Sequence, residues 1–251
     1  MAKGSGRAGE ALVVDQDQVD GADYSGRRLS RLVSIGSRFQ SCQFRDLHVD
    51  EAAFGSGGAR SEYLDCVFDG SRIRTATGDA RFVGCSFRDI DLRNWDSSTV
   101  ELVNCTFSGR MSDVIFYGHA DKLAASYRGY EINEFHDNDF SGADLRDVEF
   151  RWGIDLSRQR LPVGSDYVYL ADLPAAVANV RDEIAGWPDS NRKDAERTLG
   201  VFEREIGLGQ IQMLLRLSEY RDNDMDAQVV EHLARYASRR SAVDKEPEVG
   251  N

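Results

Sequence analysis

The sequence predicts a mainly β protein in which a four-sided β-helical solenoid is followed by a small α-helical domain. Three observations predict this fold class. Large apolar residues recur every five positions, single cysteines recur about once per four such units, and after residue 156 the apolar residues change to helical spacing.

The five-residue period predicts the solenoid. This spacing connects Phe39, Phe44, Val49 and Phe54, then Phe82, Phe87 and Leu92, then Leu102 and Phe107, and finally Tyr130, Phe135, Phe140, Leu145 and Phe150. A period of five fits neither a helix, at about 3.6 residues per turn, nor a strand, at about two. It fits a square coil in which each unit forms one side and points its central residue inward. We interpret Leu64, Phe68 and Ile73, between the blocks, as shifted by one residue.

The cysteines give the same coil length independently. Each lies two residues before a phenylalanine, at Cys42, Cys66, Cys85 and Cys105. Their spacings indicate one cysteine per coil, with an insertion near residues 55–58 and a deletion near residue 78. Asn138 is expected at the equivalent position of the next coil. Zinc sites use cysteines two to four residues apart, and parallel stacking suits a disulfide poorly. We therefore expect a buried ladder of reduced thiols.

The run Ala143–Asp147, Ala-Asp-Leu-Arg-Asp, matches the consensus of the pentapeptide-repeat family, and residues 27–156 as a whole resemble that family. The resemblance implies its right-handed quadrilateral β-helix. Residues 108–129 interrupt the repeat and are predicted to form an inserted loop. Residues 1–26 are expected to be a partly disordered N-terminal segment.

The remainder is predicted to be helical. Residues 157–171 are expected to be a linker, residues 172–241 a helical domain that caps the solenoid, and residues 242–251 a disordered tail. Asp172 before Leu173-Pro174 is typical of a helix start. Later apolar stripes predict three more helices, beginning near residues 189, 211 and 224.

Composition limits the function. The chain has 43 acidic and 31 basic residues and a net charge of −12, which disfavours direct binding to nucleic acid. No apolar run approaches the roughly 18 residues that span a membrane, so we expect a cytoplasmic protein without membrane contact. The 27 arginines against four lysines are typical of a bacterium with GC-rich DNA.

Two groups of residues are candidate interaction sites. The inserted loop offers Phe116, Tyr117, His119, Asp121 and Lys122. Outward carboxylates that could stack into an acidic face are Asp65, Asp69, Asp89, Asp91 and Asp147. The same outer surfaces carry Arg45, Arg72, Arg74, Arg81, Arg88 and Arg93, so we expect mixed charge. No residues are predicted to be catalytic, to bind a cofactor or to ligate a metal.

The leading functional hypothesis is a non-catalytic protein-interaction module with a protein partner. The family resemblance implies an alternative, because members that mimic duplex DNA bind DNA gyrase or topoisomerase IV and inhibit the enzyme or protect it from drugs. This alternative would serve antibiotic resistance or self-immunity, and a homodimer would lengthen the rod. An enzyme would need a cleft between the inserted loop and the helical domain.

Overall fold

The computed structural model describes residues 9–96, 98–129 and 131–243. It divides into two compact units. The solenoid unit runs to Glu149 and also contains Arg158–Pro162, and the second unit contains Phe150–Ser157 and the chain from Val163 onward. The predicted fold class, a mainly β solenoid followed by helices, is confirmed. Its right-handed sense stays a prediction.

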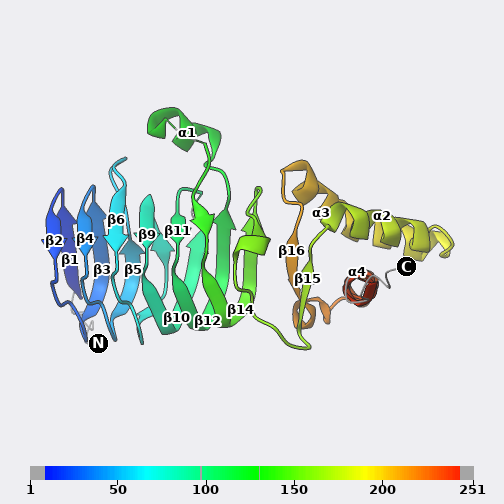
Figure 1. Ribbon diagram of the computed structural model, residues 1–251, viewed down its shortest axis with the longest axis horizontal. Coiled ribbons are helices and arrows are strands. Elements are labelled where there is room, and N and C mark those ends of the chain that lie inside the picture. The colour runs from blue at the N-terminus through cyan, green and yellow to red at the C-terminus, as the bar shows by residue number, and fades with distance from the viewer. Residues whose placement is uncertain (1–8, 97, 130, 244–251) are drawn as a thin grey trace, which may run out of the picture. The chain divides into compact units, whose positions relative to one another are not determined.

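Two sheets form the solenoid unit, with their strands stacked coil upon coil (Figure 1). The eight-stranded sheet contains β1 (Glu10–Asp15), β3 (Arg28–Ile35), β5 (His48–Ala53), β7 (Arg72–Ile73), β8 (Ala76–Thr77), β10 (Ser86–Asp96), β12 (Thr106–Tyr117) and β14 (Asp139–Arg151). The six-stranded sheet contains β2 (Gln18–Asp20), β4 (Arg38–Gln40), β6 (Ser61–Leu64), β9 (Ala80–Val83), β11 (Glu101–Val103) and β13 (Phe135–His136). Neighbouring coils pair in parallel, as β3 does with β5.

The interior is filled by columns of equivalent residues from successive coils. One column is a stack of aromatic rings from Tyr24, Phe44, Phe68, Phe87, Phe107 and Phe140. Neighbouring ring centroids in it are between 4.7 and 5.1 Å apart. This distance matches the spacing of strands in a sheet, about 4.8 Å, so each ring packs on the ring of the next coil.

The cysteine column is confirmed as a buried ladder. All four cysteines are free and buried. Each thiol points to a backbone carbonyl of the preceding coil, for example Cys66 to Phe39 at 3.5 Å and Cys85 to Tyr63 at 3.3 Å. Asn138 ends the column, because its side chain binds the Cys105 amide at 2.9 Å.

The solenoid begins earlier than residue 27. Strands β1 and β2 pair with β3 and β4 and form a first coil, so the segment that we expected to be partly disordered is ordered from Glu10 onward. The five-residue period in fact extends back through Tyr24 and Val19 to Val14. The side chains of these three inward residues are half-buried, because no earlier coil among the described residues covers them.

Tyr63, and not Leu64, occupies the inward position of its coil. It pairs with Phe39 on one side and Phe82 on the other and is fully buried. The choice of Leu64 was therefore wrong, since Tyr63, Phe68 and Ile73 keep the spacing of five. The block as a whole is still shifted by one residue relative to Phe54 and Phe82. The large ring fits the column, and its hydroxyl group has a partner inside the solenoid, whereas Leu64 lies at an outward position.

The inserted segment is shorter than predicted. Residues up to Tyr117 belong to β12, and Phe116 continues the five-residue spacing after Met111. The chain leaves the coil after Tyr117 and returns at β13, and between them it forms α1 (Lys122–Arg128), which stands away from the sheets (Figure 1). The predicted repeat residue Tyr130 lies outside the described residues.

The second unit is mixed rather than purely helical. It contains most of the 3₁₀ helix η1 (Leu156–Arg158), whose last residue belongs to the solenoid unit. Its other elements are β15 (Tyr167–Leu170), α2 (Leu173–Ile184), α3 (Asp189–Gly207), β16 (Met213–Arg216), the 3₁₀ helix η2 (Leu217–Tyr220) and α4 (Asp224–Val243). Asp172 caps α2 as predicted, because its carboxylate accepts a hydrogen bond from the Ala175 amide at 3.0 Å. No helix in the described part of the chain is both long and apolar enough to cross a membrane.

The helix expected near residues 211–223 is wrong. Most of this segment forms β16 and η2, and β16 pairs antiparallel with β15 inside the segment that we predicted to be a linker. A short apolar run such as Met213–Leu215 suits a strand or a helix equally well. Its partner strand lies more than 40 residues earlier in the sequence, so local spacing did not distinguish the two.

Candidate functional site

A cluster of arginines lies on the outward side of the eight-stranded sheet. Arg28, His48, Arg72, Asp91 and Arg110 lie opposite one another on the neighbouring strands β3, β5, β7, β10 and β12. Each directly precedes an inward core residue, so the alternation of the strand turns its side chain outward. A second row lies two residues further along the chain. We call the combined surface the arginine face and define it by Arg28, His48, Asp50, Arg72, Arg74, Asp91, Arg93 and Arg110.

The arginine face lines an open depression of about 970 Å³, together with Gly9, Leu29, Ser30 and Val49. Five arginines share this surface with two aspartates, although the whole chain has a net charge of −12. The surface is therefore locally basic on an acidic protein. Neighbouring strands lie about 4.8 Å apart, so the rows place charged groups at regular intervals across the coils.

Ion pairs orient part of the arginine face. Asp91 accepts two hydrogen bonds from Arg93, both at 2.9 Å, and also pairs with Arg72 at 3.3 Å. The hydrogen bond from Arg93 lowers the pKa of Asp91, and the charges of Arg93 and Arg72 act in the same direction. Arg74 lies 3.5 Å from Asp50, and both side chains are largely exposed. Guanidinium groups held in this way can bind carboxylate or phosphate oxygens in bidentate fashion.

The five carboxylates that we expected to form an acidic face do not share one face. Asp65 follows β6 on the six-stranded sheet, whereas Asp91 belongs to the arginine face on the other sheet. Asp65, Asp89 and Asp147 each have a positive φ. Asp69 pairs with Arg45 at 3.2 Å. The three with a positive φ share one position, two residues after an inward residue, but these inward residues, Tyr63, Phe87 and Leu145, belong to different sides of the coil. The five carboxylates are therefore distributed around the coil.

A different acidic surface lies along β10, β12 and β14. An open depression of about 450 Å³ is lined by Asp96, Asp113, Asp147 and Glu149, together with Thr75, Ala76, Thr77, Asn94 and Ile115. Of the predicted carboxylates, only Asp147 belongs to it. The sequence did not indicate this group, because its members come from coils separated by the inserted segment.

The five residues of the predicted interaction loop lie in different environments in the structure. Phe116 and Tyr117 are buried in β12 and are 2% and 9% exposed, so they are core residues. His119 and Lys122 are exposed and line a depression of about 440 Å³ beside α1. Asp121 accepts hydrogen bonds from the Ser98 hydroxyl at 2.6 Å and from a backbone amide of α1 at 2.9 Å, so it holds the inserted segment in place.

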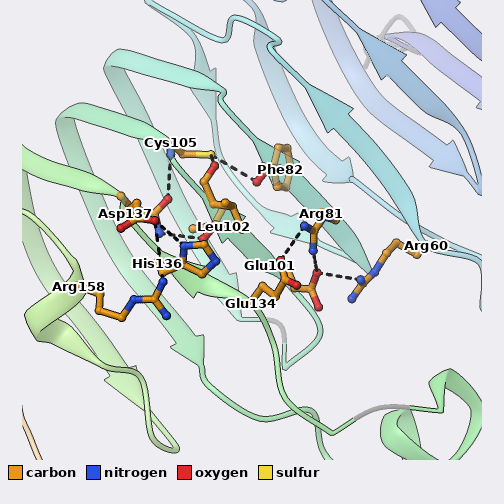
Figure 2. A network of polar contacts seen from close by, with 12 residues as sticks. Arg60, Arg81, Phe82, Glu101, Leu102, Cys105, Glu134, His136, Asp137 and Arg158 are labelled. Atoms are coloured by element: carbon orange, nitrogen blue, oxygen red, sulfur yellow. Dashed lines mark hydrogen bonds and ion pairs between the residues drawn. The ribbon is translucent and has the colours of Figure 1, made fainter.

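A network of ion pairs that the sequence did not predict lies along the six-stranded sheet (Figure 2). The carboxylate of Glu101 accepts hydrogen bonds from Arg81 at 2.6 Å and from Arg60 at 2.9 Å, and its side chain is 3% exposed. Arg81 also binds Glu134 at 2.6 Å, and Arg60 binds Asp79 at 3.1 Å. Burial raises the pKa of Asp79, against the effect of Arg60. This network connects Arg60, which follows the insertion near residues 55–58, with the coils that come after it.

Comparisons with known proteins include a weak match to a solved structure. No family model matches the chain, and no curated protein matches it. A structure of trypsin-treated QnrB1, described as a plasmid-mediated fluoroquinolone resistance protein, is similar at 14% identity with a TM-score of 0.23. The match covers 61% of this chain and 79% of that chain. At these values it carries no argument about function.

Proposed function

We propose that this chain is a non-catalytic protein-interaction module built on a solenoid of the pentapeptide-repeat type. The arginine face is the observation that carries the proposal. It is a continuous, open, charged surface that crosses the neighbouring strands β3, β5, β7, β10 and β12. An open surface of this kind fits a macromolecular partner better than a small substrate, which is usually enclosed by a pocket over most of its area.

The core explains why such a surface is effective. Stacked rings such as Phe44, Phe68 and Phe87 fix the distance between coils, with centroids 4.7 and 4.8 Å apart. The coils that carry the arginine face are therefore held at set distances from one another before any partner arrives. A preformed surface loses little conformational entropy on binding.

Affinity capture followed by binding in solution tests the proposal. The folded chain is immobilised and exposed to a bacterial lysate, and retained proteins are quantified by mass spectrometry. The matched control is Phe68→Asp, which places a charge in the fully buried column and is expected to unfold the solenoid. A partner retained only by the folded chain should also bind it in isothermal titration calorimetry. Repeated capture without any protein that binds the folded chain in solution would exclude the module.

The acidic depression favours a second candidate, a DNA-mimicking modulator of DNA gyrase or topoisomerase IV. Asp96, Asp113, Asp147 and Glu149 place four carboxylates around one open surface. Carboxylates grouped in this way could occupy part of a surface that binds phosphates.

A gyrase supercoiling assay with and without a fluoroquinolone tests this candidate. Inhibition or drug protection at low micromolar protein should be lost in Asp113→Asn/Asp147→Asn. The matched control is Asp15→Asn/Asp20→Asn, which changes the charge by the same amount at exposed positions outside both surfaces. Active gyrase that is unaffected by the protein would reject the candidate.

A further inference from the structure

We propose that the arginine face binds an extended, acidic segment of a partner protein. This inference rests on the proposed interaction function and adds the chemistry of the partner. It starts from the imbalance of charge on the surface. Five arginines and His48 share two carboxylates, and one of these, Asp91, already binds both Arg72 and Arg93. The other three arginines, Arg28, Arg74 and Arg110, are exposed, and only Arg74 lies near the remaining carboxylate of the face, at 3.5 Å from Asp50.

The arrangement of the arginines fits a chain with repeated negative charges. Arg28, Arg72 and Arg110 belong to one row across the sheet, and Arg74 and Arg93 belong to the second. The three arginines of the first row lie on every second strand and are therefore about 9.6 Å apart, whereas alternate residues of an extended peptide are about 6.6 Å apart on one side. Flexible arginine side chains can span the difference between these spacings. An extended peptide with acidic residues at alternate positions can therefore contact several arginines at once.

Two observations favour an acidic peptide over a nucleic acid. Proteins that bind single strands stack the bases on aromatic side chains, and among the described residues that line this depression only His48 carries a ring. Asp50 and Asp91 also lie within the surface, where they would repel a continuous phosphate backbone. A peptide can place neutral or basic residues opposite these two carboxylates.

Fluorescence anisotropy with synthetic peptides tests the inference directly. The probe is a labelled peptide of six alternating Glu-Ser pairs, and the comparison probe replaces every Glu with Gln. We expect the full-length protein to bind the Glu peptide and to bind the Gln peptide at least about tenfold more weakly. Raising the salt concentration from about 50 to about 300 mM should also weaken binding several-fold, because exposed charges are screened.

Charge-reversal variants locate the site. Arg74→Glu/Arg110→Glu should weaken binding of the Glu peptide at least about tenfold. Both positions are exposed, and neither is one of the two arginines, Arg72 and Arg93, that bind Asp91. The matched control, Arg38→Glu/Arg88→Glu, makes the same change of charge at exposed positions outside the arginine face and should change the affinity less than about twofold. Circular dichroism melting curves check that all variants remain folded.

Each contrary outcome has a distinct meaning. Equal binding of the Glu and Gln peptides, or equal loss in both double variants, would overturn the inference. Tighter binding of a labelled single-stranded DNA oligonucleotide than of the Glu peptide would also overturn it, in favour of a nucleic acid. If a captured partner binds Arg74→Glu/Arg110→Glu as tightly as the unchanged protein, the inference fails and the interaction module stands. If no partner binds the folded chain at all, the proposed function itself fails.

Discussion

The hydroxyl groups of Ser34 and Tyr63 lie 2.7 Å apart inside the solenoid, and both residues are fully buried. The Ser34 hydroxyl also donates a hydrogen bond to the Phe54 carbonyl at 2.7 Å. The pair allows a tyrosine to occupy a column position otherwise filled by apolar residues. Burial raises the pKa of Tyr63 well above its usual value, against the effect of Ser34. The tyrosine therefore stays neutral over the physiological range.

Ser34→Ala should destabilise the fold more than Tyr63→Phe. The first change leaves the Tyr63 hydroxyl buried without its partner, which costs about 1–3 kcal/mol. The second removes the buried hydroxyl itself and leaves Ser34 with the Phe54 carbonyl, so it should cost about 1 kcal/mol or less. Urea unfolding of both variants and of the double variant measures the coupling. Additive effects of the two changes would show that the hydroxyl groups do not interact.

Gly55 and Gly78 lie where two coils approach most closely. A Cβ atom at Gly55 would lie 1.7 Å from the Asp79 carbonyl oxygen, and one at Gly78 would lie 2.4 Å from the Gly55 carbonyl oxygen. Gly78 also has a φ of +112°. Neither contact can relax by a rotation of a side chain, because both involve backbone atoms.

Gly78→Ala should therefore lower the free energy of unfolding by more than about 3 kcal/mol. Gly58→Ala is the matched control, because Gly58 also has a positive φ, of +75°, but a Cβ atom added there would have no atom within 4 Å. Backbone strain alone should cost it about 1 kcal/mol. Thermal melting curves and urea titrations give both values. Equal losses in the two variants would show that strain, and not close approach, sets the cost.

The thiol ladder makes the solenoid sensitive to alkaline pH. The neighbouring Cys85 thiol and burial raise the pKa of Cys66, and burial raises the pKa of Cys85. In the unfolded chain both thiols should ionise near a pH of about 8.5. Since the folded pKa values are higher, their stabilising effect is complete below that pH and is lost as the pH rises above it.

The expected slope is about 1.4 kcal/mol per pH unit for each fully titrating thiol. Urea unfolding between about pH 7 and about pH 9.5, with a reductant present, measures it. Cys66→Ala should lower the free energy of unfolding at about pH 7, because it leaves a cavity. Above about pH 8.5 it should also make the decrease of this free energy with pH less steep, by the contribution of one titrating thiol. A slope that is the same with and without Cys66 would contradict this account.

The regular part of the fold was predictable, because each coil must fill the same interior with a large residue at a fixed interval. The cysteine ladder and the stack through Phe68 follow from this requirement. The spacing of five to Phe68 favours Tyr63 over Leu64 as the inward residue, but its buried partner Ser34 was not predictable, because it lies 29 residues earlier. The first coil was missed although Val14, Val19 and Tyr24 continue the period, since small valines among polar residues resemble a disordered terminus.

The arginine face was predictable only in part. Arg72, Arg74 and Arg93 were expected at outward positions, but their alignment with Arg28 and Arg110 depends on where coils gain or lose residues. The insertion near residues 55–58 changes the sequence spacing between the second coil and every later coil. The predicted acidic face did not form for a different reason, because carboxylates such as Asp65 and Asp91 lie on different sides of the coil.

Glu101 and Glu62 occupy equivalent outward positions of the six-stranded sheet, each just before an inward residue, but their surroundings differ. Glu101 binds two guanidinium groups, and its side chain is 3% exposed, whereas Glu62 binds Arg38 at 2.6 Å, and its side chain is 36% exposed. Glu101→Gln removes the negative charge between Arg60 and Arg81 in a buried site. It should lower the free energy of unfolding by about 3–5 kcal/mol.

Glu62→Gln is the matched control, since the same change at an exposed pair should cost about 1 kcal/mol or less. Urea unfolding at low and high salt separates the two cases. Added salt should reduce the already small effect at Glu62 and leave the larger effect at Glu101 nearly unchanged, because buried pairs are poorly screened. If both variants lose the same small amount, Glu101 is solvated in solution and the network does not hold these coils together. A large loss of stability at Glu101 alone would instead show that burial of the ion pair, and not its presence alone, determines how much it contributes to the free energy of unfolding.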